Sequence, residues 1–163
     1  MKQQLIFVSF VALLIILLLG CTMQAPQSAV DACKTKYASQ IDNLNNCLRH
    51  VFAQYSDVNG CKTQLTDSPG HYYQSACLQE IAEFTLDTSI CKGLTDNSYA
   101  SDCYKRVAFN KRDSSICAEI TKRNPADAET QDYCYFDLKD CNNIQNTSTK
   151  DTCISTPMPW LNK

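Results

Sequence analysis

Cysteine is the residue type in this chain with the most chemistry to offer, because its thiol can carry a lipid, form a disulfide or bind a soft metal. The 163 residues contain eleven cysteines. Cys21 closes a hydrophobic leader whose apolar run extends from Leu5 to Leu19, and the other cysteines follow at nearly regular intervals. The spacing therefore separates one cysteine placed for modification from ten placed for pairing.

The leader has the parts of a secretory signal, namely the basic Lys2, a short apolar core and the small Gly20 directly before Cys21. Its apolar run is shorter than the roughly 20 residues that span a bilayer. Residues 18–21 resemble the lipobox of prokaryotic lipoproteins, in which the signal is cut before a cysteine that carries a lipid. The resemblance implies lipidation of Cys21 and anchoring at the extracytoplasmic face of the cell membrane. An uncleaved membrane helix is the alternative.

Four segments follow from this pattern: a signal peptide at 1–20, a lipidated cysteine with a flexible tether at 21–30, one domain at 31–155, and a tail at 156–163 with two prolines and the only Trp. The net charge of the chain is −2, without a cluster of Lys and Arg. The chain therefore has no electrostatic footprint for nucleic acid. The membrane and a second protein are the expected partners.

An internal repeat organises the domain. The segment from Cys77 to Leu94 aligns with the segment from Cys103 to Ile120, because each has a first cysteine (type a), apolar residues one and four positions later, and a second cysteine (type b). An aspartate precedes each type-b cysteine by four residues. The pattern recurs from Cys47 to Cys61 and, shortened by seven residues, from Cys134 to Cys141. Cys33 and Cys153 remain as a single type-b and a single type-a residue. Repeats of this length are typical of stacked helical units.

Apolar residues one, four and five positions after the type-a cysteines predict a helix. The aspartates suit the first position of a second, shorter helix, because a carboxylate accepts hydrogen bonds from the free N–H groups of a first turn. We interpret the seven missing residues of the last unit as two helical turns. The predicted fold is all-α, with tandem helical hairpins in a solenoid-like row or a compact bundle. The predicted helix caps are Asp57, Asp87, Asp113 and Asp137.

The repeat narrows the choice of disulfides. Pairing within units would join Cys134 to Cys141, which lie roughly 10.5 Å apart along a helix and are too distant for a bridge. It would also leave Cys33 and Cys153 unused. Pairing each type-b cysteine with the next type-a cysteine uses all ten, and this number of disulfides requires an oxidising compartment. The predicted pairs are Cys33–Cys47, Cys61–Cys77, Cys91–Cys103, Cys117–Cys134 and Cys141–Cys153.

Other chemistry has little support in the sequence. There is no CxxC or CxxCH motif, and the two nearest cysteines are seven residues apart, so we expect no metal and no cofactor. His50 and His71 are expected to be solvated, because no GxSxG motif or similar setting accompanies them. Asn146 begins a glycosylation sequon on a predicted loop.

Six tyrosines lie close to type-a cysteines and are predicted to pack over the disulfides. An exposed aromatic strip that binds a partner is the alternative interpretation. These tyrosines are Tyr72, Tyr73, Tyr99, Tyr104, Tyr133 and Tyr135.

The tandem units resemble cysteine-rich repeat proteins that are exported by uncultivated small-genome archaea and some bacteria. The resemblance covers about residues 47–153, is best at 77–120, and implies location and architecture without an assigned activity. By analogy, the stapled helix pairs are similar to the longer units of Sel1-like repeats. We therefore expect a membrane-anchored structural or protein-binding module without catalysis. An extracytoplasmic enzyme or enzyme inhibitor, and a metal- or redox-handling protein with labile cysteines, are the alternatives.

Overall fold

The computed structural model describes residues 24–157, so the leader, Cys21 and most of the Pro/Trp tail lie outside the described residues. Within this range the chain folds into nine α-helices, three short 3-10 helices and one small hairpin. The predicted all-α fold class is confirmed. The α-helices are α2 (Gln27–Lys36), α3 (Ile41–Gln54), α4 (Val58–Gln64), α5 (Tyr73–Thr85), α6 (Thr88–Lys92), α7 (Asn97–Lys111), α8 (Ala118–Arg123), α9 (Ala128–Asp137) and α10 (Thr147–Ser155). The remaining elements are η1 (Ser114–Cys117), η2 (Pro125–Asp127), η3 (Cys141–Asn143), β1 (Asp67–Ser68) and β2 (His71–Tyr72).

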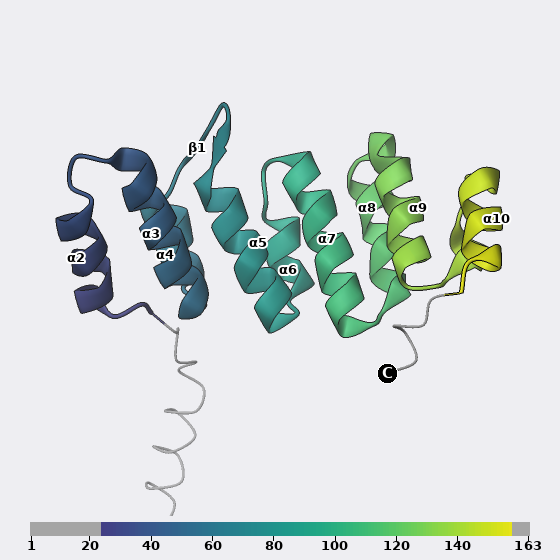
Figure 1. Ribbon diagram of the computed structural model, residues 1–163, viewed down its shortest axis with the longest axis horizontal. Helices are drawn as coiled ribbons and strands as arrows, with labels where there is room; N and C mark the ends of the chain where they lie inside the picture. The colour runs from purple at the N-terminus through teal and green to yellow at the C-terminus, as the bar shows by residue number, and fades with distance from the viewer. Residues whose placement is uncertain (1–23, 158–163) are drawn as a thin grey trace, which may run out of the picture.

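The helices form a single row, with α2 at one end and α10 at the other (Figure 1). The long helices α3, α5, α7 and α9 pack side by side in sequence order, and α4, α6 and α8 each pack against the long helices next to them. This arrangement is the solenoid-like form of the predicted fold, in which each unit contacts mainly its neighbours. We call the surface of α3, α5, α7 and α9 the long-helix face.

The core lies between the long and the short helices, where the predicted apolar stripes meet the cysteines. Eight of the ten described cysteines are buried, and Cys47 and Cys141 are half-buried. The stripe is buried because its period matches the helical repeat, so one side of each long helix is apolar. The buried stripe residues of the first three units are Leu48, Phe52, Leu78, Ile81, Ala82, Tyr104, Val107 and Ala108.

The five disulfides join the same pairs that the repeat predicts. Their Cα–Cα distances of 5.5–5.9 Å lie in the usual range for disulfides. Each bridge ties one helical unit to the next across a turn, over a sequence separation of 12 to 17 residues. In the chain-entropy model a loop of this length is stabilised by about 3 kcal/mol. The staples therefore compensate for a core with few large apolar side chains.

The ends of α3, α5, α7 and α9 share one turn. A residue with φ between 52° and 62° ends each helix, and the backbone N–H of the following aspartate donates to the carbonyl oxygen five residues earlier at 2.8–3.2 Å. This is the Schellman arrangement, which satisfies carbonyls that a helix end leaves free. The turn residues with positive φ are Ser56, Leu86, Arg112 and Lys139, and the aspartates are Asp57, Asp87, Asp113 and Asp140.

Three of the four predicted caps are confirmed. The carboxylates of Asp57, Asp87 and Asp113 accept hydrogen bonds from the N–H groups of the next helix at 2.7, 2.9 and 3.1 Å. The prediction for Asp137 is wrong, because this residue is the last of α9 and its carboxylate pairs with Lys105 at 3.1 Å. Asp140 occupies the turn instead.

The shortened unit explains this error. The turn aspartate follows the type-a cysteine by ten residues in the regular units, for example from Cys77 to Asp87, but by six from Cys134 to Asp140. The other three missing residues come from between the aspartate and the type-b cysteine, where four positions become one. The predicted loss of two helical turns is therefore wrong. Four residues are about one helical turn, so α9 is about one turn shorter than the other long helices. Losing a whole turn leaves the remaining residues on the same sides of the helix.

The folded domain begins earlier than predicted. Ala25 is buried and its backbone N–H donates to Asp57 Oδ2 at 3.0 Å, and Val30 in α2 is 2% exposed. The prediction of a flexible tether is therefore wrong for residues 25–30. Asp57 uses one carboxylate oxygen for its own helix and the other for Ala25, which holds the start of the domain at the turn after α3.

The hairpin of β1 and β2 precedes α5 and supplies its cap. Asp67 Oδ1 accepts from the backbone N–H groups of Gln74 and Ser75 at 2.8 and 3.1 Å, at the first turn of α5. Gly70 makes the hairpin possible with a φ of 82°, which other residues rarely adopt. Among the described residues, no helix has both the length and the apolar character needed to cross a membrane.

Candidate interaction surface

Ion pairs at equivalent repeat positions connect the long helices. Arg49 of α3 contacts Glu80 of α5 at 3.1 Å, and Lys105 of α7 contacts Asp137 of α9 at 3.1 Å. In both pairs the cation lies two residues after its type-a cysteine and the carboxylate lies three residues after the next one. Asp137 therefore corresponds to Glu80 in the repeat and helps to set the spacing of α7 and α9.

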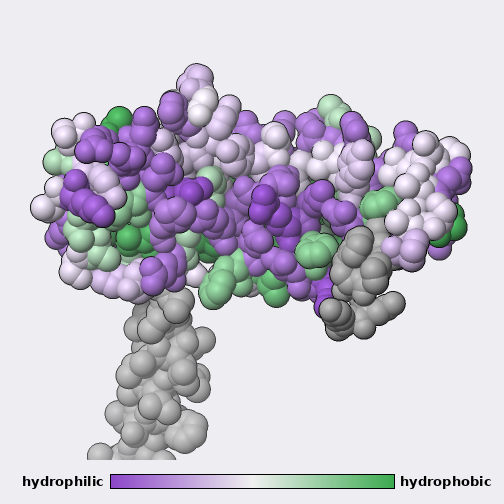
Figure 2. All heavy atoms as spheres, viewed as in Figure 1, coloured by the Kyte–Doolittle hydropathy of each residue, from purple (hydrophilic) through white to green (hydrophobic). Residues whose placement is uncertain are grey.

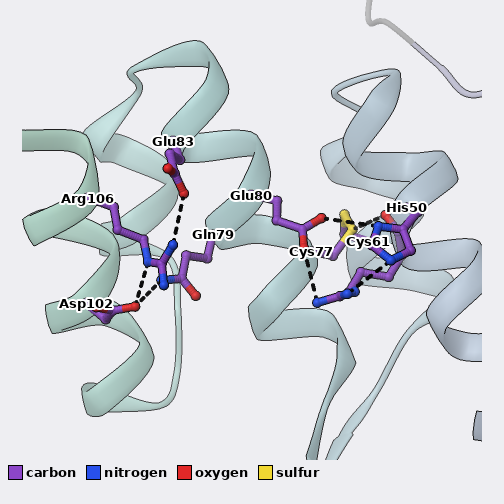
Figure 3. A network of polar contacts seen from close by, with 9 residues as sticks. His50, Cys61, Cys77, Gln79, Glu80, Glu83, Asp102 and Arg106 are labelled. Carbon is purple, nitrogen blue, oxygen red and sulfur yellow. Dashed lines mark hydrogen bonds and ion pairs between the residues drawn. A yellow bond between two sulfur atoms is a disulfide. The ribbon is translucent and has the colours of Figure 1, made fainter. Parts of the chain in front are cut away.

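Between α5 and α7 a denser polar network takes the place of the single ion pair (Figure 3). Asp102 Oδ2 accepts from Gln79 Nε2 at 2.5 Å and from Arg106 Nε at 2.8 Å. Arg106 also contacts Glu83, whose other oxygen accepts from Asn110 at 3.1 Å. The hydrogen bond to Asp102 raises the pKa of the Arg106 guanidinium. Figure 2 shows that the surface over α5 and α7 is mostly hydrophilic.

Between α7 and α9 the side chains leave an open groove of about 380 Å³. Ser101 Oγ donates to Asp127 Oδ2 at 2.5 Å at its base, and Lys105 Nζ lies 5.9 Å from the ring centre of Tyr133, which is 47% exposed. Burial raises the pKa of the Tyr99 hydroxyl. The groove is lined by Ser98, Tyr99, Ser101, Asp102, Lys105, Asp127, Thr130 and Tyr133.

The groove combines two aromatic rings, a lysine and several hydroxyl groups in a half-open setting. Tyrosines with a polar edge are enriched where proteins contact one another, because they bury apolar area and still form hydrogen bonds. Ser101 and Asp127 resemble part of a nucleophilic site, yet neither histidine lies in the groove. The groove therefore offers hydrogen-bonding groups and aromatic area side by side.

Neither histidine lines this groove. The His50 side chain is 65% exposed on α3, with Arg49 Nη2 at 3.2 Å and Glu80 at 3.9 Å (Figure 3). The His71 side chain is 50% exposed in the hairpin, where Asp42 lies 3.6 Å away. Both are exposed, as expected for solvated histidines. Sequence reasoning missed their acidic neighbours, which come from other helices.

The tyrosines divide between the two interpretations that the sequence left open. Tyr104 and Tyr135 are 5% and 8% exposed and belong to the core beside the cysteines. Tyr133 and Tyr72 are 47% and 36% exposed, and Tyr72 packs on Tyr99 with ring centres 5.0 Å apart. Part of the set therefore forms core, and part forms surface.

Asn146 is the N-cap of α10, where its Oδ1 accepts from the N–H of Thr149 at 3.0 Å. The residue is exposed and directly follows the short connection from η3, in agreement with a predicted position outside a helix. Its backbone N–H donates to the buried Asp132 of α9 at 2.9 Å. The sequon thus has a fixed position at the start of the last helix.

Sequence reasoning missed a set of side chains that satisfy the carbonyls at the ends of the short helices. Gln74 Nε2 donates to Leu65 O at 2.9 Å, and Gln131 Nε2 donates to Cys117 O at 3.1 Å. Each glutamine lies three residues before a type-a cysteine, and this shared offset is the signal that identifies them. In the unit that has Ala100 at this offset, Arg123 donates to the carbonyls of Lys92 and Leu94 instead.

All ten described cysteines are in disulfides, and no group of three or more His, Cys, Asp or Glu side chains that could hold a metal occurs among residues 24–157. The fold and the surface define a class: an all-α repeat protein whose successive hairpins are stapled by disulfides. Five disulfides in one domain indicate an oxidising, extracytoplasmic environment. No protein-family model matches this chain, and no curated protein or solved structure is significantly similar to it.

Proposed function

We propose that this chain is a membrane-anchored extracytoplasmic repeat protein that binds another protein through its long-helix face, without catalysis. Its anchor is a lipid on Cys21, and its recognition site is the groove between α7 and α9.

The anchor is supported by the signal-like leader and by the position of Cys21. The leader ends in Leu-Gly-Cys, and the folded domain begins at Ala25, four residues after the cysteine. The five disulfides independently support export, because the cytoplasm keeps thiols reduced.

The observation that carries the binding role is the contrast between neighbouring spaces on the long-helix face. The network around Asp102 and Arg106 ties α5 to α7 through side-chain hydrogen bonds, whereas the groove between α7 and α9 exposes the ring of Tyr133 beside Lys105. The staples Cys91–Cys103 and Cys117–Cys134 fix the helices on both sides of this groove. A surface that is rigid before binding loses little conformational entropy on association.

The anchor is tested with the full chain expressed in a lipoprotein-processing bacterium. We expect the protein to float with the membranes, and the mass of its N-terminal peptide to show a lipid on Cys21. The variant Cys21→Ser should be secreted or retain its leader. Equal membrane association of both proteins after the leader has been cut would contradict a lipid anchor.

The binding role is tested by placing a photo-reactive benzoylphenylalanine at Tyr133 of the anchored protein in its native host. We expect a specific cross-linked protein that is lost when Lys105 is changed to Ala. The matched control carries the probe at Ile41, which is 66% exposed on α3 and distant from the groove. The same cross-links from both positions, or none from Tyr133, would contradict recognition at the groove.

A further inference from the structure

Four exposed apolar side chains gather at the turns that end the long helices. Phe84 is 79% exposed and Leu86 37% at the turn after α5, Phe109 is 45% exposed near the end of α7, and Tyr55 is 36% exposed at the end of α3. Hydrophobic residues protrude along the lower edge of the domain, beneath α5 and α7 (Figure 2). An aromatic side chain as exposed as Phe84 is unfavourable in water unless another surface covers it.

These side chains share one edge of the molecule because the repeat puts equivalent turns in line. The ends of α3, α5, α7 and α9 lie along the lower edge in Figure 1, and we call this the turn edge. The hairpin lies at the opposite edge, together with the starts of α5, α7 and α9. Neighbouring helices pack roughly 10 Å apart, so Phe84 and Phe109 lie about one and two helix spacings from the turn after α3.

The start of the folded domain lies at this same edge. The Ala25 N–H donates to Asp57, which is the aspartate of the turn after α3. Cys21 precedes Ala25 by four residues, and four residues of extended chain span at most about 14 Å. A lipid on Cys21 would therefore hold the turn edge within about 14 Å of the membrane surface.

The charges around Phe109 suit a lipid surface. Lys111 and Arg112 follow it and are both exposed. Long basic side chains beside an aromatic residue can place their apolar stems in the interface and their charges at the headgroups. The acidic groups of these turns, Asp87 and Asp113, accept hydrogen bonds from backbone N–H groups of their own helices. The sequon at Asn146, at the start of α10, belongs to the opposite end of the helical units, where a glycan would not meet the membrane.

We propose that the turn edge lies on the lipid surface, with Phe84, Leu86 and Phe109 inserted at the headgroup level. This inference rests on the proposed lipid anchor, and it adds an orientation to it. The row of helices then lies along the membrane, and the hairpin edge points away from it. The long-helix face stands upright on the surface, so its groove is open to a partner from the side.

The test uses the full lipidated chain with Trp160→Phe, which removes the only native tryptophan. One new tryptophan is then introduced by Phe84→Trp, by Phe109→Trp or by Tyr72→Trp. Each protein is reconstituted in vesicles of phosphatidylcholine and phosphatidylglycerol whose acyl chains carry bromine near the headgroup. Tyr72 is the matched control, because it is an exposed aromatic residue of the hairpin.

We expect the tryptophans at positions 84 and 109 to shift their emission to shorter wavelength and lose most of it to the brominated lipid. The tryptophan at position 72 should keep its emission. If the protein floats with the vesicles but all three positions behave alike, the orientation is wrong and the anchor stands. If the lipidated chain does not float with the vesicles, the anchor and the orientation are both overturned.

Discussion

The turn after α7 and the turn after α9 have the same backbone but different surroundings. In both, a residue with positive φ precedes an aspartate, Arg112 before Asp113 and Lys139 before Asp140. Both aspartates donate their N–H groups back into the preceding helix, at 3.0 and 2.9 Å. After the first turn a short helical segment follows, and its Cys117 lies four residues after Asp113. After the second turn, Cys141 directly follows Asp140.

The two carboxylates take different partners as a result. Asp113 accepts from the Ser115 N–H and hydroxyl of its own segment at 3.1 and 2.6 Å. Asp140 accepts from the hydroxyl of Ser114 in the previous turn at 2.6 Å and from Asn143 at 2.9 Å. The unit can therefore lose its short helix and keep its turn and its staple. The turn and the disulfide are the essential parts of the repeat, and the side-chain cap is adaptable.

The largest expected effect comes from removing one staple in each region. Cys91–Cys103 and Cys141–Cys153 have the same sequence separation of 12, so the chain-entropy contribution is about 3 kcal/mol for each. We expect the double alanine variant of the central pair to lower the melting temperature of the whole domain, because both its cysteines are fully buried and units lie on both sides. The measurement is calorimetry of both variants.

The variant in which Cys141 and Cys153 are both changed to Ala serves as the control. It should lose hydrogen-exchange protection mainly in α10 and keep most of the main transition, because α10 contacts only the end of the row. Equal loss of protection along the whole chain in both variants would contradict a repeat whose units depend on their neighbours.

The caps provide the next largest contrast. Asp57→Ala should lower the free energy of unfolding by about 2 kcal/mol, because the N–H groups of Gly60 and Ala25 both lose their acceptor in a buried setting. Asp137→Ala should cost less than about 1 kcal/mol, because it removes a half-exposed ion pair with Lys105. Urea titration of both variants checks this order, and a larger loss for Asp137→Ala would contradict the dominant role of the Asp57 cap.

Much of this fold is predictable from the cysteines alone, because their spacing reveals the repeat, and the repeat determines which cysteines form disulfides with one another. The caps at Asp57, Asp87 and Asp113 follow for the same reason. The prediction fails at Asp137 because the distance from the turn aspartate to the type-b cysteine is not constant: the last unit keeps the turn and is shorter on both sides of it. The groove at Tyr133 and the network at Asp102 were not predictable, because they depend on which side chains of adjacent helices come into register.

Acid should destabilise the turn after α7, because it protonates the carboxylate of Asp113. Its hydrogen bonds from Ser115 lower the pKa of this carboxyl below its ordinary value of 3.8. A lowered pKa means that folding favours the charged form, so the contribution is complete above the ordinary value and is lost as the pH falls through the lowered one. Asp113→Asn keeps an oxygen acceptor but does not titrate. We expect its melting temperature to fall less than that of the wild type between about pH 5 and about pH 2, and identical profiles would contradict the assignment.

The smallest effect concerns the residues with positive φ. Ser56→Gly should raise the free energy of unfolding by about 0.5 kcal/mol, because glycine adopts φ of 52° without strain but gains some entropy when unfolded. Lys139→Gly should instead destabilise the protein, because the Lys139 ammonium donates to the carbonyls of Cys153 and Thr156. If thermal denaturation shows that both substitutions stabilise the protein, or that both destabilise it, the two turns do not differ in this way.

The most direct test of the stapled repeat is the disulfide map of the mature protein, obtained by digestion without reduction and mass spectrometry of the linked peptides. We expect five linked pairs, each joining a type-b cysteine to the next type-a cysteine, including Cys117 to Cys134 and Cys141 to Cys153. A peptide that links Cys134 to Cys141, or Cys77 to Cys91, would contradict this pairing.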